Sequence, residues 1–206
     1  MAQAYIALIG YYNLNNQHQE ALLIVSKLLI KLPNSIRAIK ARADILSSLG
    51  YHDQALLDWT SALEYDEDFD SYYGRGLCYY HKKLFRSAYK DFKKANTFGA
   101  EARGFNAMGK CLKEFGDDLK AIEIQKKAIA LDPLYKEAYL DIAIAFMSQS
   151  MASEAQEYLD RVFALDPHMM TAHGWAALFY DQLGESRKVL ESVQKTLSYD
   201  PTQLST

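Results

Sequence analysis

Apolar residues recur at helical spacing in both halves of the stretch 102–135, ARGFNAMGKCLKEFGDDLKAIEIQKKAIALDPLY. In each half the apolar positions recur at offsets of three, four or seven residues, which return them to the same side of a helix. They are Phe105, Met108, Gly109 and Leu112 in the first half and Ala121, Ala128 and Leu131 in the second. The pattern predicts two amphipathic helices joined by a short turn.

The turn and the end of this helical pair carry residues that favour helix termini. Gly116 suits the left-handed residue at the end of the first helix, and Asp117 or Asp118 suits the N-cap of the second. Pro133 stops the second helix because it lacks a backbone N–H and crowds the preceding turn. One such hairpin leaves apolar faces uncovered, so we expect further copies of it in the chain.

Prolines and small residues recur with a fixed period along the whole sequence. Pro133, Pro167 and Pro201 are 34 residues apart, and Pro33 lies 100 residues before the first of them. One small residue for each expected second helix repeats at spacings of 34, 33, 33, 34 and 34: Ala21, Ala55, Ala88, Ala121, Ala155 and Val189. A period of this length marks a stacked-repeat architecture. The six repeats are 2–35, 36–68, 69–101, 102–135, 136–169 and 170–203.

The repeated residues resemble the tetratricopeptide repeat family. Its pattern has a large apolar residue, a small residue and Tyr on the first helix, then Ala, an aromatic, Ala and Pro on the second. The third repeat matches with Tyr72, Gly76, Tyr79, Ala88, Phe92 and Ala95, and the fourth with Phe105, Gly109, Leu112, Ala121, Ala128 and Pro133. The resemblance covers nearly the whole chain. It implies an all-α fold, a right-handed superhelical solenoid of six helix-turn-helix repeats that form a single domain over 1–206.

Composition and motifs argue against catalysis and against several classes of ligand. The net charge of −3 gives no general affinity for nucleic acid, and two cysteines make no disulfide framework, which suggests a reducing, cytoplasmic location. The apolar run near residue 1 is too short to span a bilayer. We find no phosphate-binding loop, dinucleotide fingerprint, nucleophile elbow or metal-ligand spacing. We therefore expect no enzyme activity, no cofactor, no metal and no membrane insertion.

The resemblance implies that the first helices line a concave groove that binds a peptide or helix of a partner protein. Its expected lining is Lys40, Asp44, Tyr73, Leu77, Tyr80, His81, Arg103, Asn106, Lys110, Lys113, Leu140, Ile144 and Met147. Tyr73 and Tyr80 are surplus to the core pattern, although they could equally be partly exposed tyrosines that cover the groove floor. The mixture suits a peptide that carries aliphatic and acidic side chains. The predicted function is a scaffold or adaptor.

One family subtype is not expected. Members that bind the acidic tails of heat-shock chaperones hold a terminal carboxylate with Lys, Asn and Arg on three successive first helices. Here Lys40 is followed by Asp44 rather than Asn, and Gly74 and Ala107 stand at further clamp positions. The negative charge of Asp44 would repel a terminal carboxylate.

Two alternative functions stay open. The outer side of the last helix, with Leu190 and Val193, has no later repeat to cover it, so the chain could be an architectural subunit that self-associates end to end through its terminal helices. It could also be the substrate-recognition arm of a larger enzyme. The uncovered ends favour a segment of a longer protein.

Overall fold

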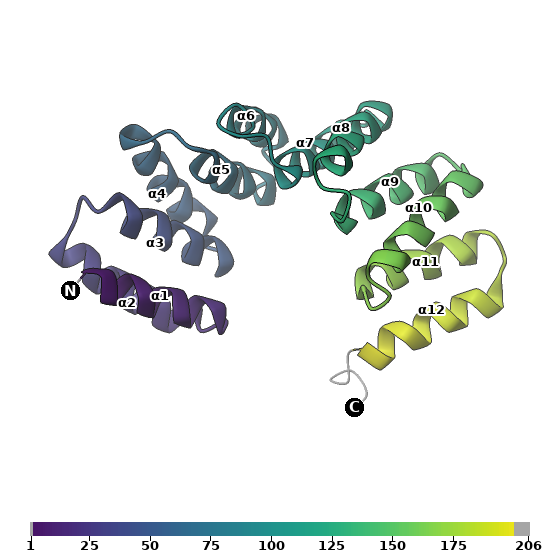
Figure 1. Cartoon of the computed structure of the whole chain (residues 1–206), viewed down its shortest axis with the longest axis horizontal. Coiled ribbons are helices and arrows are strands. Elements are labelled where there is room, and N and C mark those ends of the chain that lie inside the picture. The colour runs from purple at the N-terminus through teal and green to yellow at the C-terminus, as the bar shows by residue number, and fades with distance from the viewer. Residues whose placement is uncertain (1, 200–206) are drawn as a thin grey trace. The chain divides into compact units, whose positions relative to one another are not determined.

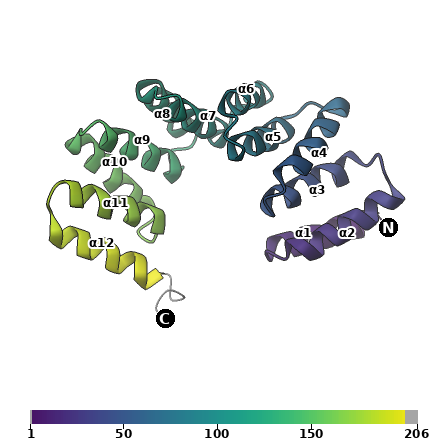
Figure 2. The same ribbon diagram turned by 180° about the vertical axis from the view of Figure 1, so that it is seen from behind.

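A computed structural model describes residues 2–199, which form twelve α-helices arranged as six antiparallel hairpins (Figures 1 and 2). The first helices of the hairpins are α1 (Ala2–Leu14), α3 (Ile36–Ser48), α5 (Phe69–His81), α7 (Ala102–Glu114), α9 (Lys136–Ser148) and α11 (Met170–Gln182). The second helices are α2 (His18–Lys31), α4 (His52–Tyr65), α6 (Phe85–Ala95), α8 (Asp118–Leu131), α10 (Ala152–Leu165) and α12 (Ser186–Tyr199). The described residues contain no strand. The all-α helical repeat fold is thus confirmed.

The turn inside each hairpin contains one residue in the left-handed conformation. Three of these residues are glycines, Gly50, Gly116 and Gly184, with φ of 80°, 76° and 72°. In the other three hairpins Asn16, Lys83 and Ser150 take the same place with φ of 56°, 60° and 58°. These residues repeat at 34, 33, 33, 34 and 34 positions, the same spacing as the small residues of the second helices. The backbone of the turn is therefore repeated even where the sequence departs from glycine.

Side-chain caps confirm two helix starts. The carboxylate of Asp117 accepts a hydrogen bond from the backbone N–H of Lys120 and begins α8, as expected from the sequence. Asp68 does the same for α5 through the backbone N–H of Ser71 at 2.8 Å. Both caps occupy a backbone N–H that has no partner within its own helix.

The chain divides into two compact units, residues 1–111 and 112–206, each with its own core. In the first unit, one cluster is built around Val25, Leu28 and Ile45 and another around Trp59 and Cys78. In the second, α9, α10 and α11 enclose a cluster that includes Leu159, Val162 and Phe179.

Small residues lie where neighbouring helices approach most closely. The repeating alanines Ala21, Ala55, Ala88, Ala121 and Ala155 are all buried, with at most 4% of their surface exposed. A Cβ atom placed on Gly74 would lie 2.5 Å from the indole of Trp59, and one on Gly76 would lie 2.7 Å from the ring of Phe92. The periodic small residues thus set the packing of the hairpins. Cys78 and Cys111 are buried, and neither forms a disulfide bond.

Candidate interaction surfaces

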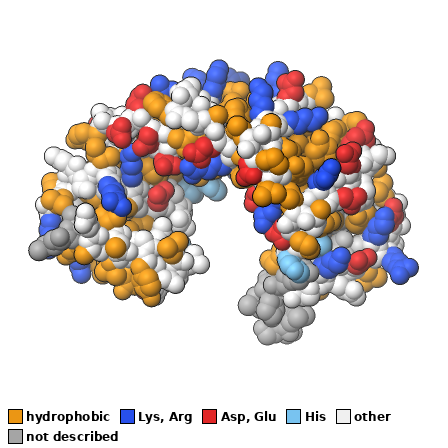
Figure 3. All heavy atoms as spheres, in the orientation of Figure 1, with side chains coloured by type: hydrophobic (Ala, Val, Ile, Leu, Met, Phe, Trp, Pro, Cys, Tyr) orange, Lys and Arg blue, Asp and Glu red, His pale blue; other side chains and the backbone are white. Residues whose placement is uncertain are grey.

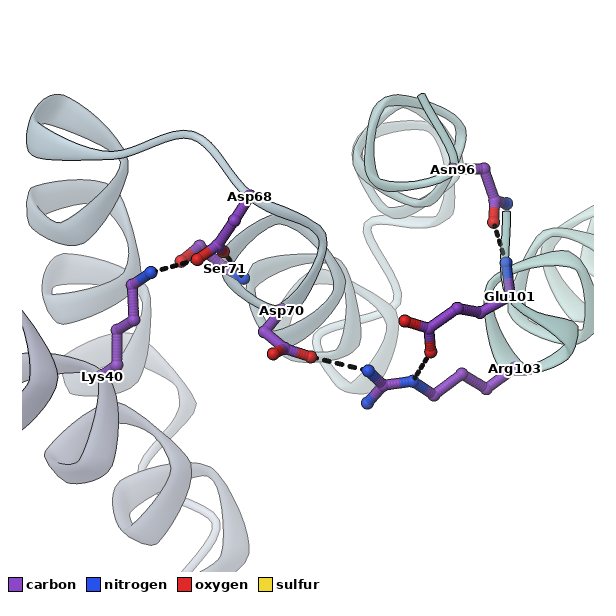
Figure 4. Close-up of polar contacts among 7 residues, drawn as sticks. All are labelled: Lys40, Asp68, Asp70, Ser71, Asn96, Glu101 and Arg103. Atoms are coloured by element: carbon purple, nitrogen blue, oxygen red, sulfur yellow. Dashed lines mark hydrogen bonds and ion pairs between the residues drawn. The ribbon is translucent and has the colours of Figure 1, made fainter. Parts of the chain in front are cut away.

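In the first unit, Lys40 of α3 is paired with acidic residues at the start of α5. Its ammonium group contacts the carboxylate of Asp68 (Figure 4). It also lies 3.7 Å from the carboxylate of Asp66. Asp68 also caps α5, so one carboxylate both starts a helix and holds a neighbouring lysine. Burial raises the pKa of Asp68, but its bonds to Lys40 and Ser71 outweigh that effect and leave the pKa below its usual range.

Arg103 of α7 makes a second ionic contact between first helices. Its Nη2 donates to Asp70 of α5 at 2.6 Å, and its Nε donates to Glu101 at 2.6 Å (Figure 4). The guanidinium also lies over the rings of Phe69, 4.6 Å from the centroid, and Tyr73, at 4.9 Å. Arg103 is therefore held in one place by two carboxylates and two aromatic faces.

The start of α7 is fixed by a further hydrogen bond. The side-chain oxygen of Asn96, which follows α6, accepts from the backbone N–H of Glu101 at 3.3 Å (Figure 4). Because Glu101 in turn holds Arg103, the loop between α6 and α7 positions a side chain of the next helix.

Asp44 of α3 is an acid in an unfavourable setting. Its side chain is exposed to solvent, yet the protein around it displaces enough water to raise its pKa, and the negative charge of Asp70 raises it further. Arg103 lowers it, and the balance places the pKa at about 6. The ionised carboxylate thus destabilises the folded state at neutral pH.

The predicted groove aromatics of the first unit contact other rings. Tyr73 is half-buried, stacked on Phe69 and tilted against Phe92, with centroids 5.5 Å away in each case. Tyr80 meets the edge of Phe85 at 5.3 Å. Both tyrosines thus pack against neighbouring rings, and each keeps part of its side chain accessible.

His81 at the end of α5 stacks on His52 at the start of α4. The two imidazole rings are 4.8 Å apart and nearly parallel, with an interplanar angle of 1°. Burial, together with the charges of His81 and Lys82, lowers the pKa of His52. The stack therefore favours a neutral imidazole at position 52.

The remaining groove residues expected in the first unit differ in accessibility. Leu77 and Lys110 are half-buried, whereas Asn106 is buried with 4% of its surface exposed. The side chain of Asn106 thus offers a partner little surface.

The second unit has a cavity of about 380 Å³ between the first helices α7, α9 and α11. Three of its lining residues, Lys113, Ile144 and Met147, are among the groove residues expected from the sequence. The others are Ser148, Trp175, Leu178, Phe179, Asp181 and Gln182. Leu140, also expected in the groove, is buried in the core cluster with 6% of its surface exposed.

Trp175 and Leu178, which sequence reasoning did not place in the groove, contribute the most exposed apolar surface of this cavity. They are 40% and 58% exposed. The ammonium group of Lys113 lies 5.6 Å from the ring centroid of Trp175. Leu178 stands one period of 34 residues after Ile144, which was expected in the groove, so the register could have placed Leu178 there.

The described residues show no group of three or more histidine, cysteine, aspartate or glutamate side chains that could hold a metal ion. Between residues 2 and 199, no helix has both the length and the apolar character needed to cross a membrane. The surface instead mixes apolar and charged side chains, with Lys and Arg gathered over α6 at the top of Figure 3.

Comparison with known protein families finds one family whose sequence pattern matches the fourth hairpin. The sequence pattern of the tetratricopeptide repeat matches residues 102–133. Among curated proteins, the chain is 25% identical over 174 residues to BBSome complex member BBS4 of Bos taurus. The match covers 79% of this chain and 34% of BBS4, so the chain spans about a third of the length of that relative.

Solved structures share the fold. The chain resembles YrrB, described as a tetratricopeptide repeat protein with an unusual peptide-binding site, with a TM-score of 0.59, 24% identity and coverage of 86% of this chain and 92% of YrrB. It also resembles a chain of the APC/C hetero-tetramer Cut9–Hcn1, with a TM-score of 0.85 and 19% identity, over 98% of this chain and 40% of that one. Similarity at these identities establishes the fold alone.

Proposed function

We propose that this chain, which carries a tetratricopeptide repeat and has the fold of that family, is a non-catalytic protein–protein interaction module. The observation that carries the proposal is the cavity between α7, α9 and α11, where exposed Trp175 and Leu178 stand beside Lys113. Tryptophan is enriched among residues that dominate binding energy, and a concave apolar site with a few polar groups suits a peptide anchor. BBS4 is named as a member of a protein complex, which agrees with this role.

The chemistry of the cavity suggests the kind of partner. Ile144, Met147 and Trp175 can surround an aliphatic or aromatic side chain. Lys113 can meet a carboxylate next to that anchor, because it lines the same cavity and its ammonium group lies 5.6 Å from the ring centroid of Trp175. We therefore expect the partner segment to pair a large apolar residue with an acidic one.

We expect the first unit to contribute to partner binding in a different way from the cavity of the second unit. Lys40 and Arg103 are already paired with Asp68, Asp70 and Glu101, so an acidic ligand would have to displace these carboxylates. Asp44 adds further negative charge to this face. A terminal carboxylate is therefore not the expected ligand here, in agreement with the sequence-based argument against chaperone tails. The remaining predicted groove residues of this unit, including Tyr73, Tyr80 and Lys110, are proposed as secondary contacts.

An intracellular, reducing compartment is part of the proposal. Cys78 and Cys111 are buried and form no disulfide bond, and burial raises the pKa of Cys78, which keeps it protonated and unreactive. Neither cysteine contributes to a disulfide framework.

Selection of peptides from a random display library on the immobilised chain tests this function. We expect selected peptides to share an apolar anchor next to an acidic residue. Trp175→Ala should weaken their binding at least tenfold without changing the far-ultraviolet circular dichroism. Leu119→Ala, at an apolar residue that is 72% exposed on α8, is the matched control and should bind normally. Selected peptides that bind Trp175→Ala as well as the original chain would rule out this cavity as the site.

Intrinsic fluorescence provides a second readout. The chain has two tryptophans, of which Trp59 is 2% exposed and Trp175 40% exposed, so quenching by acrylamide reports mainly on Trp175. A selected peptide that fills the cavity should shield Trp175 and reduce quenching. Unchanged quenching at saturating peptide would place the bound peptide elsewhere.

A further inference from the structure

The last hairpin exposes a position that the other hairpins bury. Val193 of α12 is 41% exposed. The residues at the same place in four earlier second helices are fully or almost fully buried: Val25 at 0%, Trp59 at 2%, Phe92 at 0% and Leu159 at 0%. The exposure of Val193 therefore comes from its place in the stack, because its side chain is of the kind that the repeat normally packs.

Val193 lies in an apolar groove of about 390 Å³ between α11 and α12. Each residue that lines this groove has a counterpart 34 positions earlier, in the preceding hairpin. There, α11 helps to bury the counterparts. The lining is Gly174, Ala177, Leu178, Asp181, Val189, Val193, Thr196 and Leu197. The counterparts Leu140, Ala143, Ile144, Met147, Ala155, Leu159, Val162 and Phe163 all belong to the core cluster of the second unit or pack against it. The groove thus corresponds to a binding surface for a first helix such as α11.

On the fifth hairpin, α11 covers the surface that corresponds to this groove. The face of α11 that does so carries small and apolar side chains. Ala172, Ala176 and Phe179 belong to that core cluster and are 0%, 0% and 3% exposed. A helix that fills the groove should present a similar row, with small or aliphatic residues four positions apart and a larger one three positions later.

Among the first helices that the structure describes, α1 is the one whose residues at these three positions are all at least partly exposed and not covered by another helix. On α1 the equivalents of Ala172, Ala176 and Phe179 are Ala4, Leu8 and Tyr11. Ala4 is exposed, Leu8 is 43% exposed and Tyr11 is 60% exposed. Residues at the position of Tyr11 in other first helices, such as Ile45, Cys78 and Cys111, are 0% exposed.

Val193 and Tyr11 occupy positions that lie in a common core cluster at other junctions between hairpins. The equivalents of Val193 and Tyr11 share a core cluster at three junctions, as Val25 with Ile45, Trp59 with Cys78 and Leu159 with Phe179. Charge is compatible as well, because α1 has the sequence AQAYIALIGYYNL without a charged side chain, and Asp181 is the one charged residue that lines the groove. Docking would therefore bury no unpaired charge of α1.

We propose that the groove between α11 and α12 of one copy seats α1 of a second copy, with Tyr11 against Val193 and Leu8 beside it. The contact joins different surfaces of the two copies, so it is head-to-tail and leaves a free groove and a free α1 at the ends of each assembly. One helix on one hairpin buries on the order of 1,000 Å², the low end of specific interfaces, so the association is reversible and depends on concentration.

Sedimentation of matched variants tests the contact. Leu8→Lys with Tyr11→Lys removes the helix surface, and Val193→Lys removes the groove. We expect the average mass of the original chain to rise from low to high micromolar concentration, and each variant alone to stay monomeric with an unchanged circular dichroism spectrum. An equimolar mixture of the two should form a dimer and stop there, because each variant keeps one intact surface.

Three outcomes would overturn the proposal: a monomeric original chain at all these concentrations, variants that still associate on their own, or a mixture that stays monomeric. Should Val193→Lys weaken the fold, Thr196→Lys provides a second groove variant. A synthetic peptide of residues 2–16 offers an independent readout. It should bind the original chain at least tenfold more tightly than either groove variant.

Discussion

Arg42 of α3 donates two hydrogen bonds to the carboxylate of Asp58 of α4, through Nε and Nη2, each at 2.7 Å. The next hairpin repeats this pair sixteen residues apart, as Arg75 with Asp91 at 2.7 and 3.0 Å. Both carboxylates are only 10% exposed. Other hairpins have apolar pairs at these positions: Leu8 with Ile24, Met108 with Ile124, and Ile142 with Tyr158. In the fifth hairpin, Ile142 and Tyr158 lie in the same apolar cluster, so the repeat can join its two helices by either kind of contact.

We expect that an apolar pair of side chains can replace the Arg42–Asp58 ion pair with little loss of stability. Arg42→Met alone should lower the free energy of unfolding by about 2–4 kcal/mol, because it leaves the Asp58 carboxylate without its partner. Arg42→Met combined with Asp58→Ile copies the pair of the fourth hairpin and should restore stability to within about 1 kcal/mol of the original chain. Urea unfolding of the two variants measures both values. A double variant less stable than the single one would mean that the ion pair does more than satisfy its own charges.

Gly74 should not tolerate a side chain. Its substitution by Ala would place a Cβ atom 2.5 Å from the indole of Trp59, which is buried and cannot move aside. We expect a loss of about 1–3 kcal/mol in thermal or urea unfolding. Gly10→Ala is the control, since no atom lies within 4 Å of its added Cβ and α1 gains a better helix former. If both variants were equally stable, the packing of Trp59 against Gly74 would be wrong.

Substitutions at the left-handed turn residues should change stability in opposite directions, depending on whether glycine is introduced or removed. Ser150→Gly should stabilise the fold by about 0.5–1 kcal/mol, because glycine adopts a φ of 58° without strain. Gly116→Ser should destabilise it by a similar amount, because no atom lies within 4 Å of the added Cβ and the cost is purely conformational. Melting temperatures of the two variants should move in opposite directions, and a shift of the same sign in both would contradict this account.

The raised pKa of Asp44 predicts how stability changes with pH. The folded chain takes up this proton at about pH 6, whereas an unfolded aspartate does so near about pH 4. The folded state binds more protons between these values, so this group's contribution to stability is full below the lower one and is lost as pH rises through 6. Asp44→Asn should raise the urea midpoint at neutral pH by a modest amount, because solvent screens an exposed carboxylate, and the gain should shrink under acidic conditions. An unchanged difference across this window would assign the pKa shift to another group.

Cys78 and Cys111 should react slowly with thiol reagents in the folded chain. Both are fully buried, and burial raises the pKa of Cys78, so little thiolate is available. Leu14→Cys supplies a matched exposed thiol, since Leu14 is 88% exposed, and should be labelled quickly in the same tube. Mass spectrometry of the labelled protein separates the three sites. Rapid modification of Cys78 would show that its core opens readily.

Part of the candidate site could be predicted because the repeat register assigns each first-helix position a direction. Lys113, Ile144 and Met147 were expected in the groove, and all three line the cavity of the second unit. Register cannot say whether a charged side chain already has a partner. Lys40 and Arg103 proved to be held by carboxylates from a neighbouring hairpin and from the loop before α7, which no spacing rule indicates.

The sequence by itself determined that the chain folds as an all-α helical repeat, because helix periodicity, small residues and turn signals are local and recur at a fixed spacing. The tertiary structure decided which equivalent positions are covered. Trp59 and Val193 occupy the same place in their repeats, yet one is 2% and the other 41% exposed, because burial depends on the neighbouring hairpin. The same reason separates Leu140, buried in the core, from Trp175, whose ring is left at the surface of a cavity.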